Sequence, residues 1–134
     1  MVRIDLSDIK DLFDSDINSK ELVNRLVAIL EKSESIETRL GLLEILNEYN
    51  LQHSSFFKIF ENHLISDAQE EIRILAAEII LRNFVEEGLD ALEWTINNDP
   101  SPLVLGRVYN LIKELNSSYM LILESILFEK FKII

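Results

Sequence analysis

His53 and His63 are the only histidines in this 134-residue chain, and ten positions separate them. Two metal ligands on one helix face need a spacing of three or four residues, as in His-x-x-x-His or Glu-x-x-His. Neither of these patterns surrounds the two histidines. We therefore predict ordinary surface or partly buried histidines and no metal site.

The run His53-Ser54-Ser55 places a base next to hydroxyl groups, as nucleophilic catalysis would require. Adjacent residues seldom face each other productively, and no orienting acid or oxyanion hole is marked in the sequence. The serines are better explained as helix caps. No catalytic residue is predicted, and the protein is expected not to be an enzyme.

The segment from Asp14 to Asn18 imitates the start of a calcium loop, with oxygen ligands at positions 1, 3 and 5. Such a loop needs glycine at position 6 and a bidentate glutamate at position 12. Ser19 and Arg25 stand there instead, and an arginine would repel the cation. A capped loop before a helix is predicted.

With no cysteine and three glycines, neither thiol chemistry nor a phosphate-cradling loop is expected, and no cofactor is predicted.

The charge of the chain limits its partners. Asp and Glu number 24 against 13 Lys and Arg, which gives a formal net charge of −11. Both halves are acidic, and no basic stripe offsets them. This sign opposes binding to nucleic acid and to anionic membrane surfaces. No basic, apolar leader opens the sequence, and no apolar run approaches the roughly 18 residues of a membrane span. We expect a cytoplasmic protein.

Apolar residues recur at helical spacing along nearly the whole chain. Leu22, Leu26 and Leu30 form one such stripe, and Ser101-Pro102 is a typical N-cap followed by proline at the first helical position. No segment alternates with period two for long enough to predict a strand. The predicted fold class is all-α.

Similar segments recur at nearly constant intervals. The residues from Arg39, from Arg73 and from Leu105 align with offsets of 34 and 32. A turn with a serine or an acid precedes each segment, and a helix of similar length follows it. This periodicity predicts three helical hairpins in one domain over 1–134. Their ranges are about 19–50, 54–84 and 87–116, with terminal helices over 1–14 and 118–134.

The stretch from Asp67 to Pro102 resembles a HEAT repeat of the short kind, also found in phycobilisome-lyase-like proteins. That pattern opens its second helix with Asp, an aliphatic-Arg pair and Ala-Ala, and continues with a glycine turn, Ala-Leu and Asp-Pro. This sequence supplies Asp67, Ile72-Arg73, Ala76-Ala77, Gly88, Ala91-Leu92 and Asp99-Pro100. The resemblance covers roughly residues 20–116 and implies an α-α superhelix.

The resemblance also implies structural roles for four residues. Asp67 and Asp99 would cap helices, and Arg39 and Arg73 would each reach an acidic or carbonyl group at a repeat junction. The other two copies depart from the pattern, because Leu42 replaces the alanine and Leu105 the arginine. A tetratricopeptide repeat is the alternative, since its period is similar and Leu105 to Tyr109 fits its Leu-Gly-x-x-Tyr motif.

A helical stack of this kind predicts a non-enzymatic module that binds a protein or peptide, and its acidity suits a basic partner. The expected contacts lie on the second-helix face: Glu37, Glu44, Glu48, Glu70, Glu78 and Arg107. Two alternatives stay open: a small acidic inhibitor or immunity-type protein that occludes a basic site, and a self-assembling structural protein. Self-association would use the apolar C-terminal residues Phe128, Phe131, Ile133 and Ile134, because terminal repeats normally present a polar outer face. These residues could instead fold back onto the preceding hairpin.

Overall fold

The computed structural model describes residues 11, 19–48, 54–115 and 117–131. Four sequence predictions fall outside this part: the helix over 1–14, which meets it only at Asp11, the loop from Asp14 to Asn18, His53, and the terminal pair Ile133 and Ile134. The described residues form helices and no strand, so the prediction of an all-α chain is confirmed. The helices are α2 (Ser19–Lys32), α3 (Ile36–Glu48), α4 (Ser54–Ser66), α5 (Glu70–Asn83), α6 (Leu89–Asn98), α7 (Pro102–Glu114) and α8 (Ser118–Phe131).

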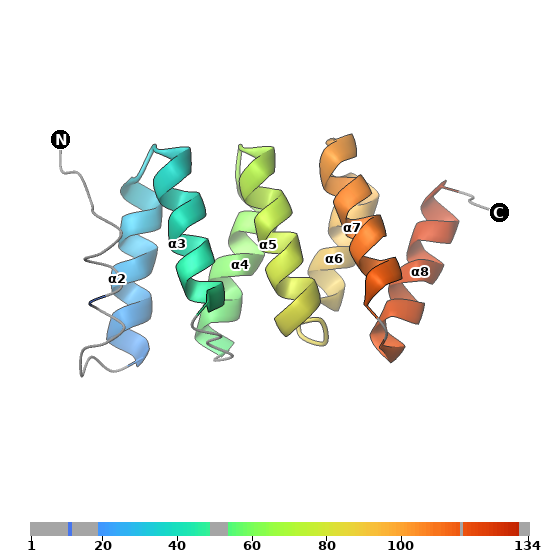
Figure 1. Ribbon diagram of the computed structural model, residues 1–134, viewed down its shortest axis with the longest axis horizontal. Coiled ribbons are helices and arrows are strands. Elements are labelled where there is room, and N and C mark those ends of the chain that lie inside the picture. The colour runs from blue at the N-terminus through green and yellow to red at the C-terminus, as the bar shows by residue number, and fades with distance from the viewer. Residues whose placement is uncertain (1–10, 12–18, 49–53, 116, 132–134) are drawn as a thin grey trace.

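The helices lie in two layers. One layer contains α3, α5 and α7, which contact one another in that order, and the other contains α2, α4, α6 and α8. In Figure 1 the first layer stands in front of α4 and α6, with α2 and α8 at opposite ends. Each predicted hairpin contains one helix of each layer, and α8 follows as a last helix that contacts α6 and α7.

Local signals in the sequence explain where the helices begin and end. The Ser101 hydroxyl accepts a hydrogen bond from the Val104 amide at 3.3 Å, and Pro102 occupies the first turn of α7. Glu70 and Glu71 lie in the first turn of α5 and Arg82 in its last, which suits the helix dipole. Short turns at 33–35, 67–69 and 99–101 separate the two helices of each hairpin.

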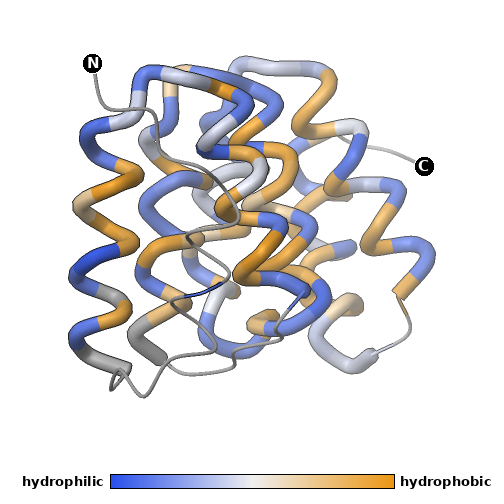
Figure 2. The backbone as a smooth tube through the Cα atoms, turned by 60° about the vertical axis from the view of Figure 1, so that its left-hand side comes forward, coloured by the Kyte–Doolittle hydropathy of each residue, from blue (hydrophilic) through white to orange (hydrophobic). Residues whose placement is uncertain are grey.

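Apolar side chains fill the space between the layers. In Figure 2 hydrophobic and hydrophilic stretches alternate along the helical turns. The α5 helix is buried on several sides because it contacts α3, α4 and α7, and its Ile72, Ala76 and Ile80 are fully covered. Phe84 follows α5 and packs against Phe60, with ring centroids 5.6 Å apart. Burial of this kind is the main favourable contribution to folding.

One glycine is required by close packing in the turn between α5 and α6. A Cβ atom on Gly88 would overlap the Ile80 side chain and would lie 3.0 Å from the carbonyl oxygen of Phe84. Gly106 in α7 has nothing within 4 Å of the same position. Across the ranges given above, no helix has the length and apolar character of a membrane span.

Candidate interaction surfaces

Asp67 joins the turn between α4 and α5 to helix α3. Its Oδ2 atom accepts a hydrogen bond from Arg39 Nη1 at 2.7 Å and lies 2.8 Å from His63 Nδ1. Its Oδ1 atom accepts a hydrogen bond from the Gln69 amide at 2.9 Å. The Asp67 side chain is only 1% exposed, so the carboxylate is almost fully removed from water. A buried carboxylate requires such partners to remain charged.

The same arrangement recurs one hairpin later. Arg73 donates from Nε to Asp99 Oδ2 at 2.9 Å and from Nη2 to Oδ1 at 3.3 Å, which is a bidentate pair. Arg73 Nη1 also donates to the Asp67 carbonyl at 2.9 Å, so this arginine contacts both turns. Asp99 Oδ1 accepts a further hydrogen bond from the Ser101 amide at 3.0 Å. The four residues that sequence reasoning named singly thus lie together in two pairs.

The predicted partner-binding residues differ in how exposed they are. Glu37, Glu44 and Glu48 are exposed on α3. Glu70 is half-buried and accepts a hydrogen bond from the Ser101 hydroxyl at 2.5 Å. Sequence reasoning could not find this contact, because the two residues are 31 positions apart.

Glu78 of α5 and Arg107 of α7 bind each other. Arg107 Nε lies 2.6 Å from Glu78 Oε1. This hydrogen bond raises the pKa of Arg107 above its usual value, although the loss of water around the guanidinium opposes the rise. Both side chains are about one third exposed, so the pair is a partly solvated link between two helices.

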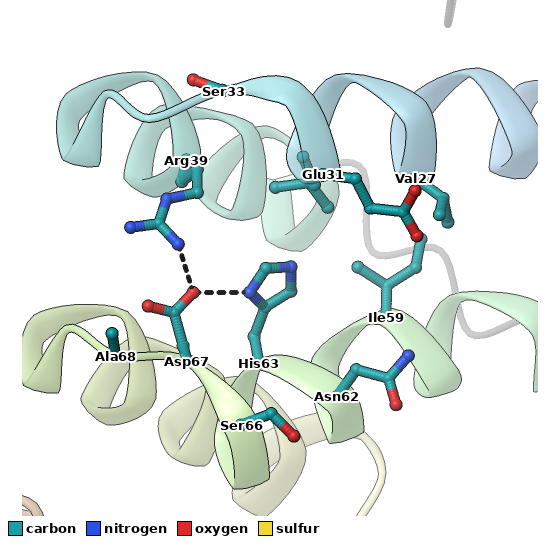
Figure 3. A pocket seen from close by; sticks show the side chains of 11 residues that line it. Val27, Glu31, Ser33, Arg39, Ile59, Asn62, His63, Ser66, Asp67 and Ala68 are labelled. Carbon is teal, nitrogen blue, oxygen red and sulfur yellow. Dashed lines mark hydrogen bonds and ion pairs between the residues drawn. The ribbon is translucent and has the colours of Figure 1, made fainter.

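A cleft of about 330 Å³ opens between α2, α4 and the beginning of α3. Figure 3 shows His63 reaching into it from α4 below Glu31 of α2, with Arg39 and Asp67 beside them. An imidazole held by a carboxylate is the geometry of a general base, but here Arg39 binds the same oxygen and offsets the negative charge. In the described ranges no three His, Cys, Asp or Glu residues are grouped as a metal site would need. Arg39, His63 and Asp67 thus join α3, α4 and the α4–α5 turn at one side of the cleft. The spacing of four between His63 and Asp67 is the sequence signal for their contact.

The position equivalent to His63 in the next hairpin is occupied by Thr95. Thr95 follows His63 by 32 residues, as Asp99 follows Asp67. Thr95 is fully buried, and its Oγ1 has no hydrogen-bond partner in the part of the chain that the structure describes. A buried hydroxyl without a partner loses its water and gains nothing in return.

Thr95→Val should therefore stabilise the protein, because valine keeps the shape of the side chain and removes the unpaired hydroxyl. We expect the free energy of unfolding to rise by about 1 kcal/mol in urea denaturation. Thr38→Val is the matched control, because Thr38 is only half-buried, and it should change stability by less than about 0.5 kcal/mol. A loss of stability in Thr95→Val would show that this hydroxyl has a partner.

The α8 helix has one buried side and one exposed apolar side. Met120, Leu123 and Leu127 are buried. Phe128 is 49% and Phe131 is 43% exposed. The helix thus packs onto the preceding hairpin, and part of its apolar surface still faces solvent.

The HEAT-like resemblance receives no independent support from known sequences or structures. Comparison of this chain with protein-family models, with curated proteins and with solved structures finds no match.

Proposed function

We propose that this protein is a non-enzymatic interaction module of the HEAT-like, superhelical type that binds a basic protein or peptide in the cytoplasm. The observation that carries this proposal is the acidic stripe on α3, by which we mean Glu37, Glu44 and Glu48. Their spacings of seven and four place all three on one side of the helix, and all three are exposed. Gly41 lies between them on the same side and adds no bulk.

A rigid base supports the acidic stripe. Arg39 connects α3 to the α4–α5 turn through its hydrogen bond to Asp67. Asn83 of α5 donates a hydrogen bond of 2.9 Å to Asn47 of α3. Contacts at both ends of α3 limit its movement against α5. Fixed charges attract a basic helix with a smaller loss of side-chain and backbone freedom than charges on a mobile loop. Glu70 and Glu78 are half-buried and bind Ser101 and Arg107, and in this proposal they mainly hold the layer together.

The test uses a labelled Lys- and Arg-rich helical peptide of about 15 residues as the probe. The triple variant Glu37→Gln, Glu44→Gln and Glu48→Gln should weaken its binding at least about tenfold in fluorescence anisotropy at low salt. Raising the salt concentration from about 0.05 to 0.3 M should weaken binding to the unmodified protein, because salt screens the exposed charges.

The matched control carries the same change of charge away from α3: Glu87→Gln, Asp90→Asn and Glu93→Gln, all at exposed positions. It should bind the peptide within about threefold of the unmodified protein. Equal losses in both triple variants would mean that the peptide senses only the net charge, and the acidic stripe would not be a binding surface. A pull-down with mass spectrometry would then identify the natural partner and show whether it is an enzyme that the protein occludes.

A further inference from the structure

Strongly exposed large apolar side chains gather on α8. In the described part of the chain six such residues are more than 40% exposed, and four of them are in this helix: Leu121 at 68%, Ile122 at 49%, Phe128 at 49% and Phe131 at 43%. The other two are Trp94 and Leu103. Single exposed apolar residues are ordinary, but a cluster on one helix marks an interaction surface.

One side of α7, next to α8, has no neighbouring helix among the described residues, as a comparison of α7 with α5 shows. The α5 and α7 helices begin 32 residues apart, so Tyr109 and Lys113 of α7 correspond to Ala77 and Leu81 of α5. Arg73, one turn before Ala77, binds Asp99 in the turn before α7, so this side of α5 faces α7. Ala77 and Leu81 are buried there, whereas Tyr109 is half-buried and Lys113 is exposed. The corresponding side of α7 thus carries no further helix among the described residues.

A groove runs between α7 and α8 at this place. It joins a hollow of about 150 Å³ and one of about 420 Å³, which share Ile112, Lys113 and Glu124. Ile112 and Leu127 form an apolar floor, and both are buried. Lys113 and Glu124 stand on opposite walls. Lys113 Nζ lies 5.0 Å from the centroid of the Tyr109 ring. The groove therefore has an apolar floor and a rim that carries both signs of charge.

We propose that this groove receives the α8 helix of a second copy, so that the protein forms a two-fold dimer through its α7–α8 edge. Within the chain, α7 packs against α5 and α6 with Val104, Val108 and Leu111, which are spaced i, i+4 and i+7. The exposed edge of α8 presents Leu121, Ser125 and Phe128 at the same spacing. A two-fold axis parallel to α8 would place each α8 beside the partner's α7, where the next helix of that layer would lie.

Symmetry and charge both favour a second copy over another protein. A two-fold contact buries the same surface on both molecules, so one arrangement covers both exposed edges and closes the assembly. The mixed rim complements itself, because Lys113 of one copy can approach Glu124 of the other. A uniformly basic or acidic helix would meet one like charge in the groove. This surface is separate from the acidic stripe on α3, so the dimer and the proposed function can fail independently.

Sedimentation velocity or light scattering from about 1 µM to 1 mM tests the dimer. The chain should pass from monomer to dimer in this range. Each copy carries a formal charge of −11, so added salt should strengthen the dimer by screening repulsion. That response is opposite to the one expected for a basic peptide on the acidic stripe.

A matched pair of leucines locates the interface. Leu121→Asp should weaken the dimer at least tenfold, and Leu103→Asp should change it less than threefold, although both leucines are similarly exposed at 68% and 63%. Both variants should keep the circular dichroism spectrum of the parent chain, which excludes unfolding as the cause. A parent chain that stays monomeric to 1 mM, or equal losses in the two variants, would overturn the proposal.

Single cysteines test the direction of the two helices, because the chain has no cysteine of its own. With the axis parallel to α8, Leu121→Cys should form a disulfide with itself across the dimer, and so should Phe128→Cys. In an equal mixture of the two variants, an antiparallel pair would instead join position 121 of one copy only to position 128 of the other, since a disulfide needs Cα atoms within about 7 Å. Mixed disulfides alone would overturn the parallel arrangement. Leu103→Cys, away from the groove, should stay reduced under the same mild oxidation.

Discussion

Asp99→Ala is expected to lower the free energy of unfolding by about 3 kcal/mol, and the melting temperature by about 10 °C. The carboxylate is 1% exposed and binds Arg73, which is 12% exposed. Removal of the carboxylate would leave a mostly buried guanidinium whose only hydrogen-bond partner among the described residues is the Asp67 carbonyl. The Ser101 amide would also lose its acceptor at the beginning of α7. Chemical denaturation followed by circular dichroism measures the loss.

Two further variants separate the ion pair from the turn. Asp99→Asn keeps an oxygen for the Ser101 amide and should cost less than the alanine variant, because it loses mainly the charge. Glu93→Ala removes an exposed carboxylate from the same helical hairpin and should change stability by less than about 0.5 kcal/mol. If Asp99→Ala and Glu93→Ala had equal effects, the contact between Arg73 and Asp99 would contribute nothing to stability.

Gly88→Ala is expected to destabilise the protein by about 1–3 kcal/mol. The new Cβ would overlap the Ile80 side chain and would lie 3.4 Å from Cε1 of Phe57, so the α5–α6 turn would have to move. The cause is steric, because the φ angle of Gly88 is −94°, which any residue can adopt. Gly88 is also the N-cap residue of α6, where alanine is a poorer choice than glycine.

Gly106→Ala makes the same substitution where there is room, in the interior of α7. Alanine is a better helix former than glycine, so this variant should gain about 0.5–1 kcal/mol. The two glycine variants should therefore have opposite signs in one thermal or urea denaturation experiment. A stabilised Gly88→Ala would show that the α5–α6 turn can open without loss of packing.

Helix positions were predictable from the sequence because their signals are local. Ser101 and Pro102 mark the beginning of α7, and apolar residues three and four apart mark the buried side of each helix. These signals act within one or two turns of the chain, so they depend little on the surrounding fold. The superhelical twist and the repeat family depend on small rotations between hairpins, and they remain predictions.

The candidate site was predictable only in part, because side-chain pairing depends on neighbouring helices. Glu70 and Glu44 were both predicted to contact a partner, yet Glu70 binds Ser101 from 31 residues away, whereas Glu44 is exposed. The exposure of Leu121 is likewise invisible in a helix that is apolar on almost all sides. Which apolar residues stay uncovered depends on where α6 and α7 pack against α8.

The sequence by itself determined that this chain is helical, acidic and without cysteine, and it singled out Arg39, Asp67, Arg73 and Asp99. Only the tertiary structure decided that Arg39 meets Asp67, that Arg73 meets Asp99, and that no further described helix covers Leu121 at the α7–α8 edge. The physical reason is the range of the interactions. Hydrogen bonds within a helix join residues four apart, whereas these ion pairs join residues 28 and 26 apart, and the packing of whole helices sets their geometry.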